Sequence, residues 1–90
     1  MSSSDAVYYK YTNLSASAQI AVGQVRLGGI FCASSTSGTV KVWDSTAASG
    51  DICVNTFAVT AGTYYPIPAL LKTGCYITIA NTADITVMWL

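Results

Sequence analysis

Apolar residues alternate with polar ones over short stretches of this chain, and no stretch keeps a helical apolar period for longer than about two turns. The segment 39–43 shows the alternation most clearly, because Val40 and Val42 point to one side and Thr39, Lys41 and Trp43 to the other. Residues that favour strands, above all Val, Ile, Thr and Tyr, are abundant. Clusters of Ser, Thr, Gly, Asn and Asp separate the stretches roughly every 8–12 residues. The pattern predicts an all-β chain.

We expect one small antiparallel β-sandwich or jelly roll of about seven to eight short strands, the architecture that such spacing favours. The expected strands lie at 6–11, 18–22, 24–33, 39–43, 52–60, 63–67, 75–80 and 85–90, with turns at 34–38, 61–62 and 81–84. Pro66 and Pro68 confine their strand to an edge or a strand end. Residues 14–90 form the β-sandwich domain, and residues 1–13 are either a free N-terminal arm or the first strand of the same sheet.

A glycine pair at 28–29 leaves the phase of one strand open. If the alternation runs straight through the pair, Phe31 shares a face with Leu27. If the pair forms a β-bulge, Ile30 and Cys32 take that face instead.

Charged residues are rare in this chain. Only 9% of its residues are charged, against roughly 25% in ordinary soluble domains, while 52% are hydrophobic and the net charge is zero. A surface so poor in charge promotes association, so we expect other protein to cover it. No basic patch supports a nucleic-acid partner, and prolines interrupt the uncharged run 52–71, so no membrane partner is expected. The charged residues are Asp5, Lys10, Arg26, Lys41, Asp44, Asp51, Lys72 and Asp84.

The same composition removes most catalytic chemistry. General acid–base catalysis needs a group that titrates near neutrality, and the chain has no His. Asp44 and Asp51 flank a loop whose hydroxyl groups suit Ca²⁺, but their spacing matches no calcium loop. We therefore expect no enzymatic activity, no metal and no cofactor.

The three cysteines, Cys32, Cys53 and Cys75, fit neither a zinc site nor a closed disulfide framework. We interpret them as small buried hydrophobes, with a single disulfide or a reactive thiol as the alternatives. The chain start has no cationic or apolar region typical of a secretory signal, so we expect folding in a reducing cytoplasm.

Surface recognition is the remaining kind of function, and aromatic residues are its candidates. Tyrosines in the N-terminal segment bury a large area at low entropic cost when they meet a partner, which makes that segment a candidate tether. Aromatic side chains on a non-core face meet another subunit, stack on a sugar ring, or lie inside a fold that is covered on both faces. All three interpretations stay open, although few polar groups are available for sugar hydroxyls. The candidate oligomer or capsid interface residues are Tyr8, Tyr9, Tyr11, Trp43, Tyr64, Tyr65 and Tyr76.

The run 38–50, GTVKVWDSTAASG, together with 54–57, 61–68 and 73–79, resembles small structural proteins of tailed bacteriophages, namely capsid decoration (cement) and head-fibre subunits. The similarity covers residues 25–90, leaves the N-terminal segment outside, and includes no active-site motif. It implies a β-sandwich or jelly roll with a place in the virion.

We therefore expect a non-enzymatic virion structural protein, a decoration subunit that binds the major capsid protein on the capsid exterior and stabilises the phage head. Decoration subunits of this kind are commonly trimers, so a homotrimer made in the host bacterial cytoplasm is expected. Repeated attachment to the lattice makes modest affinity per copy sufficient. The alternatives are a fibre or tail module that binds host-surface glycan and another minor structural component of the virion.

Overall fold

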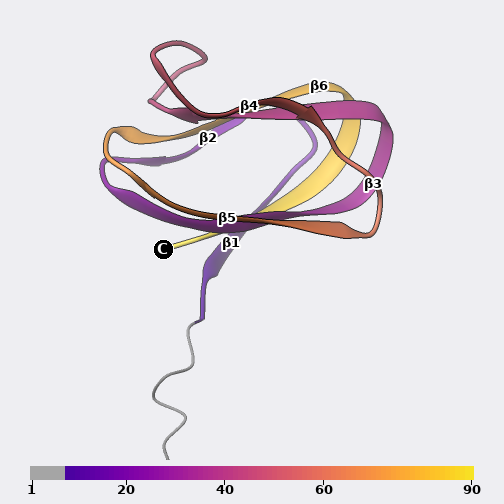
Figure 1. Cartoon of the computed structure of the whole chain (residues 1–90), viewed down its shortest axis with the longest axis horizontal. Coiled ribbons are helices and arrows are strands. Elements are labelled where there is room, and N and C mark those ends of the chain that lie inside the picture. The colour runs from indigo at the N-terminus through magenta and orange to yellow at the C-terminus, as the bar shows by residue number, and fades with distance from the viewer. Residues whose placement is uncertain (1–7) are drawn as a thin grey trace, which may run out of the picture.

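The computed structural model describes residues 8–90, and this part of the chain is all-β (Figure 1). Six strands form one antiparallel sheet. They are β1 Lys10–Leu14, β2 Ala18–Val22, β3 Val25–Asp44, β4 Asp51–Ala58, β5 Thr63–Leu71 and β6 Gly74–Trp89. Residues 1–7, which include the start of the expected arm and first strand, lie outside the described residues.

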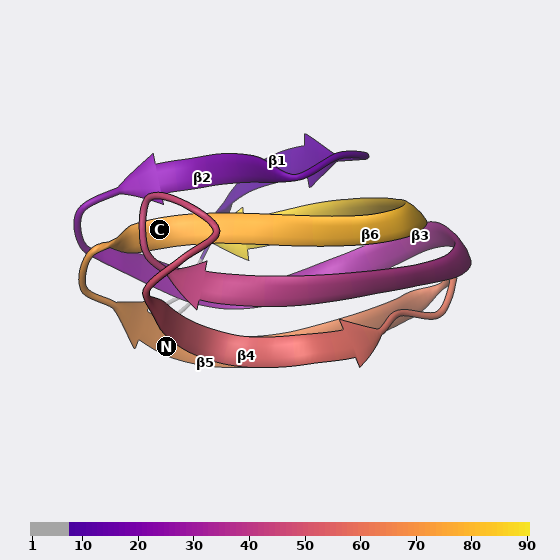
Figure 2. The ribbon, with the colours of Figure 1, turned by 90° about the horizontal axis from the view of Figure 1, so that it is seen from above.

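The long strands β3 and β6 form the centre of the sheet and pair with each other from Leu27↔Trp89 to Trp43↔Tyr76. Both bend midway, so that the sheet has two halves which face each other (Figure 1). In one half, called here the β5 half, the order is β5-β3-β6-β1, and in the other, the β4 half, it is β4-β3-β6-β2. Figure 2 shows that the two halves share the same order of long strands, with β1 and β2 along one edge and β4 and β5 along the other.

The apolar core lies between the two halves. Alternation places Val40 and Val42 of β3 on its inner side, as expected, together with Ile77, Ile85 and Val87 of β6. No polar or charged side chain is buried in the described part of the chain. The core therefore depends on apolar packing alone.

The glycine pair at 28–29 forms a β-bulge, because the register of β3 shifts between Leu27 and Gly29 against both of its neighbours. Beyond the bulge Ile30 and Cys32 are fully buried, whereas Phe31 is 38% exposed. Of the two alternatives for this strand, the bulge is therefore confirmed.

The expected count of seven to eight strands is wrong, because two expected turns are bends inside the long strands. Segments 34–38 and 81–84 stay paired with each other through these bends. Ser37 and Asn81 adopt left-handed backbone, with φ of 54° and 60°, and the Asn81 side chain donates a hydrogen bond of 2.8 Å to the Ser37 carbonyl. Gly and Asn favour left-handed backbone, and Ser favours turns through its hydroxyl group. These preferences serve a bend in a continuing strand as well as a chain reversal.

The shorter strands follow the expectations with shifted ends. β2 begins and ends as expected, whereas β5 continues past both prolines to Leu71 and pairs only with β3, so that its prolines lie on an edge strand. β1 was expected at 6–11 and lies at Lys10–Leu14, paired with β6. Residues 10–13 are therefore part of the sheet, and the expected boundary after residue 13 falls inside β1.

Candidate interaction surfaces

The outer face of the β5 half carries a largely apolar surface, called here the tyrosine face. Cross-strand register places its side chains in two rows, one from Tyr11 through Met88 and Gly29 to Pro66, the other from Asn13 through Thr86 and Phe31 to Tyr64. The large side chains of this face are far from buried, and Tyr11 is 76% exposed. The apolar members of the tyrosine face are Tyr9, Tyr11, Phe31, Tyr64, Pro66, Pro68, Leu70 and Met88.

The glycine bulge seats two of these rings. A Cβ at Gly28 would lie 2.7 Å from the ring of Tyr9, and one at Gly29 would collide with the hydroxyl of Tyr64. The Tyr64 hydroxyl donates a hydrogen bond of 3.2 Å to the Gly28 carbonyl. Both tyrosines therefore pack directly on the β3 backbone, at positions where any other residue would push them away.

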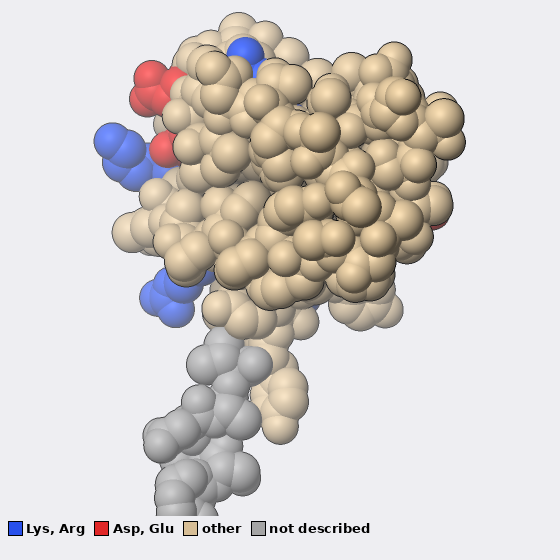
Figure 3. Space-filling model, turned by 45° about the vertical axis from the view of Figure 1, so that its right-hand side comes forward, with Lys and Arg blue, Asp and Glu red and all other residues tan. Residues whose placement is uncertain are grey.

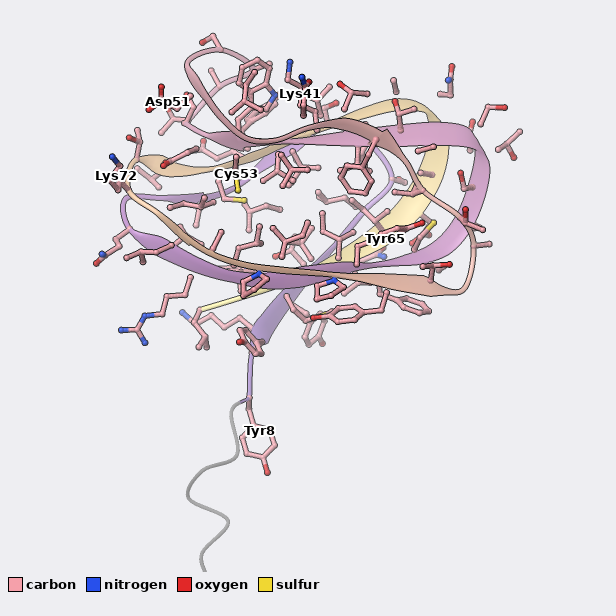
Figure 4. All side chains as sticks on the ribbon, viewed as in Figure 1. Tyr8, Lys41, Asp51, Cys53, Tyr65 and Lys72 are labelled. Carbon is pink, nitrogen blue, oxygen red and sulfur yellow. The ribbon has the colours of Figure 1, made fainter. Side chains whose placement is uncertain are left out.

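Charged side chains lie around the tyrosine face and not across it. Within the described residues, Arg26 lies at one end of the face, opposite Leu70, and Asp84 lies at the other end, where it accepts a hydrogen bond of 2.8 Å from the Asn13 side chain. Lys10 lies instead with its ammonium group 5.0 Å from the centre of the Trp89 ring. Figure 3 shows Lys, Arg and Asp side chains gathered on one side of the molecule, with an uncharged surface over the rest of the view. Lys72 and Asp51 belong to that charged end (Figure 4).

The outer face of the β4 half, called here the tryptophan face, mixes aromatic and polar side chains. Trp43 stands between Ile52 on β4 and Tyr76 on β6, and Tyr76 stands next to Gln19 on β2. The register also places Lys41 and Thr78 on this face. This surface therefore differs from the tyrosine face, since polar side chains lie between its rings.

The Trp43 indole is held in place on both its ring and its nitrogen. The Lys41 ammonium lies 4.2 Å from the ring centre, within cation–π range. The indole N–H donates a hydrogen bond of 2.9 Å to the Thr78 hydroxyl. Trp43 is consequently a fixed feature of this surface and not a freely rotating side chain.

The structure does not bring the seven expected aromatic residues together. Tyr9, Tyr11 and Tyr64 lie on the tyrosine face, whereas Trp43 and Tyr76 lie on the tryptophan face of the opposite half. The two remaining candidates, Tyr8 and Tyr65, belong to neither face.

Tyr8 is 83% exposed and projects away from the body of the molecule (Figure 4). Tyr65 turns toward the core, where its ring meets Phe57 edge-on at 5.4 Å. The Tyr65 hydroxyl accepts a hydrogen bond of 2.8 Å from the Thr60 N–H. Tyr65 therefore packs inside the fold, while its neighbour Tyr64 faces outward.

Sequence reasoning missed the members of the tyrosine face that are not tyrosines. Phe31, Leu70 and Met88 were not among the candidates, nor were the two prolines. The sequence held one signal of this surface: every second residue of β5 points to the same face, and this set is apolar and exposed. Its members are Tyr64, Pro66, Pro68 and Leu70. An apolar set on the solvent side of an edge strand indicates a covered surface.

Asp44 ties the end of β3 to the connection between β5 and β6. Its carboxylate accepts hydrogen bonds from the backbone N–H groups of Thr73, at 2.8 Å, and Lys72, at 3.0 Å. These bonds, that of Thr73 first, hold the pKa of Asp44 below its ordinary value despite some desolvation. Among residues 8–90, no group of three or more His, Cys, Asp or Glu side chains is placed to hold a metal ion.

All three cysteines carry free thiols, and Cys32 and Cys75 are fully buried. Burial raises the pKa of Cys75 to about 12. Burial also raises the pKa of Cys32 and of Cys53. The interpretation of these residues as small buried hydrophobes is thus confirmed for Cys32 and Cys75, whereas Cys53 is half-buried.

The part of the chain that the structure describes encloses no pocket. No helix long and apolar enough to cross a membrane occurs in that same part. Comparisons with protein-family models, with curated proteins and with solved structures find no match to this chain.

Proposed function

We propose that this chain is a non-enzymatic structural subunit of a tailed-phage particle, a capsid decoration (cement) protein that binds the major capsid protein on the capsid exterior and stabilises the head. The tyrosine face carries the proposal. It is an outward surface of aromatic and aliphatic side chains on a chain with 9% charged residues, and such a surface favours burial against other protein. The resemblance of residues 25–90 to decoration and head-fibre subunits supports the same role.

We further propose that the fold is a jelly roll. If each bent strand is counted as two segments, residues 8–90 contain eight segments in two four-stranded layers, the number found in jelly rolls. Successive segments change layer at each connection except the one from β3 to β4. Jelly rolls occur in viral capsid proteins and in lectins, so this topology is compatible with the leading role and with one alternative.

The proposed action is mechanical. A homotrimer made in the host bacterial cytoplasm attaches to the completed lattice and bridges neighbouring capsid subunits, which opposes the pressure of the packaged DNA. Each copy needs only modest affinity, because the linked copies of one oligomer bind together. Fixed side chains such as Trp43 lower the entropic cost of each contact, since less freedom is lost on binding.

The number of copies per particle tests this role. Quantitative mass spectrometry of purified virions, with the major capsid protein as internal standard, should find the chain in hundreds of copies. Adding the purified protein to heads that lack it should restore that number and raise the temperature at which the heads release DNA. A few tens of copies or fewer, or heads that bind none of the added protein, would contradict the decoration role.

A fibre or tail module that binds host-surface glycan is the second candidate, and the tryptophan face favours it. Trp43 and Tyr76 offer neighbouring rings on which a sugar can stack, while Gln19, Lys41 and Thr78 offer polar groups for its hydroxyls. A glycan array would detect such binding. Affinity that falls at least tenfold in Trp43→Ala but not in Tyr11→Ala would favour this candidate over decoration.

A further inference from the structure

We infer that the tyrosine face is the surface through which copies of this chain pack against one another, and that the tryptophan face on the opposite half stays outside this contact. The inference deepens the proposed function and rests on it only for the oligomer's place on the head. The partner is another copy of the same chain, and three properties of the face point to it.

The first property is size. The exposed fractions of Tyr9, Tyr11, Phe31 and Tyr64 are 43%, 76%, 38% and 47%, which amounts to about two whole aromatic side chains or roughly 400 Å². Leu70, 57% exposed, and the two exposed prolines extend the patch. A stable interface buries about 800 Å² on each partner, with an apolar centre and a polar rim. The apolar patch supplies the centre, and neighbouring Asn13, Thr86 and Arg26 supply a rim.

The second property is charge. Within the described residues, two charged side chains border this face: Arg26 at one end, opposite Leu70, and Asp84 at the other, where its carboxylate accepts a hydrogen bond of 2.8 Å from the Asn13 side-chain amide. Two such faces meet without trapping an unpaired charge at their centre, which would be costly. A partner of different composition usually gains specificity from opposite charges, and the centre of this face offers none. Interfaces between permanent copies are also more apolar than those formed by independently folded partners.

The third property is rigidity. Tyr9 and Tyr64 pack on the glycine backbone of β3, and the Tyr64 hydroxyl is hydrogen-bonded to the Gly28 carbonyl. Pro66 and Pro68 have fixed φ, and both belong to a paired strand. Few rotamers are lost when such a surface is covered, so more of the apolar burial appears as affinity.

The tryptophan face provides the contrast and the matched control. One of its exposed apolar residues, Ile52, is 46% exposed, comparable with Leu70, and the polar side chains of Lys41 and Thr78 lie beside its cross-strand neighbour Trp43. A mixed surface of this kind resembles those that meet partners after folding. We therefore expect a charge introduced at residue 52 to leave the packing between copies intact.

The test compares Leu70→Lys and Tyr11→Lys with the control Ile52→Lys by light scattering after gel filtration, from 1 to 100 µM. The wild type and the control should have a mass that is a multiple of the 9.4 kDa chain. Both tyrosine-face variants should run as the 9.4 kDa chain, or need at least 100-fold higher concentration to associate. Circular dichroism and urea unfolding of each variant show whether it is folded.

A second readout keeps the inference open to refutation if a lysine variant does not fold. A photo-crosslinking phenylalanine analogue at residue 11 should join two chains on illumination, and the same analogue at residue 52 should not. Three outcomes would each overturn the inference. The wild type is monomeric at 100 µM, the lysine variants keep the wild-type mass, or the analogue crosslinks two chains from residue 52 and not from residue 11. Lysine variants that keep the wild-type mass would leave the decoration role standing. Heads that bind none of the added wild-type protein would refute that role, whichever surface joins the copies.

Discussion

Gly38 stands at the corner where β3 bends, and a single added methyl group there tests how the bend is built. A Cβ at this position would lie 2.6 Å from the Thr82 carbonyl oxygen, 2.7 Å from the Cβ of Ala83 and 2.8 Å from the Ser35 hydroxyl. The Thr82 oxygen belongs to the backbone of β6, so the clash is relieved only if the two central strands move apart. Overpacking of this kind costs about 1–3 kcal/mol, and we expect Gly38→Ala to lie near the upper end, at about 3 kcal/mol.

Urea unfolding followed by tryptophan fluorescence, at one fixed protein concentration, measures this cost. The melting temperature should fall by roughly 4–8 °C per kcal/mol. Adding Ala83→Gly removes one of the clashing groups, so the double variant should be about 0.5–1 kcal/mol more stable than the sum of the single changes predicts. A Gly38→Ala protein within about 0.5 kcal/mol of the wild type would refute the close approach of β3 and β6 at this corner.

Three further predictions concern single side chains. Asp44→Asn should lower the free energy of unfolding by about 1 kcal/mol at neutral pH. This difference should vanish as the pH falls from about 3.9 through the lower pKa of folded Asp44, because a lowered pKa stabilises the fold only while the group is ionised. The same difference at pH 6 and at pH 2, measured by urea unfolding, would contradict this. Iodoacetamide at pH 8 should modify Cys53 in the folded protein, but Cys75, with its pKa of about 12, only after unfolding. Equal rates of alkylation of the two cysteines in the folded protein, measured by mass spectrometry, would contradict this prediction. Tyr65→Phe should cost about 1 kcal/mol, because the Thr60 N–H loses its acceptor, and equal urea midpoints would show that this bond contributes nothing.

The sequence was sufficient to predict the all-β class, β2, and the inward alternation of Val40 and Val42, because period-2 patterning directly reports which face of a strand is buried. It was not sufficient to predict the strand count. The cluster around Ser37 and the one around Asn81 read as chain reversals when each is taken alone. Only their pairing across the two strands, with the Asn81 side chain bonded to the Ser37 carbonyl, turns both into one shared corner.

The sequence was sufficient to name the tyrosines of the candidate surface, but not Phe31 and not the way in which the aromatic residues are grouped. Tyr64 and Tyr65 are neighbours of the same type, yet one faces outward and the other packs against Phe57. Their orientation follows from the register of β5 against β3, where Tyr65 is opposite buried Ile30. Register depends on partners distant in sequence, and a one-residue slip exchanges the two faces. Local pattern alone therefore could not separate the tyrosine face from the core.

The position of β6 in chain order has a consequence for biosynthesis. β6 is, together with β3, an inner strand of both halves, and it leaves the ribosome after every strand with which it pairs. A nascent chain that stops short of Gly74 has no partner for β1 or β2, and the inner edge of β3 stays open. Closure of the sheet therefore waits for β6, and pairings of such long sequence separation place it in the slow range of milliseconds to seconds.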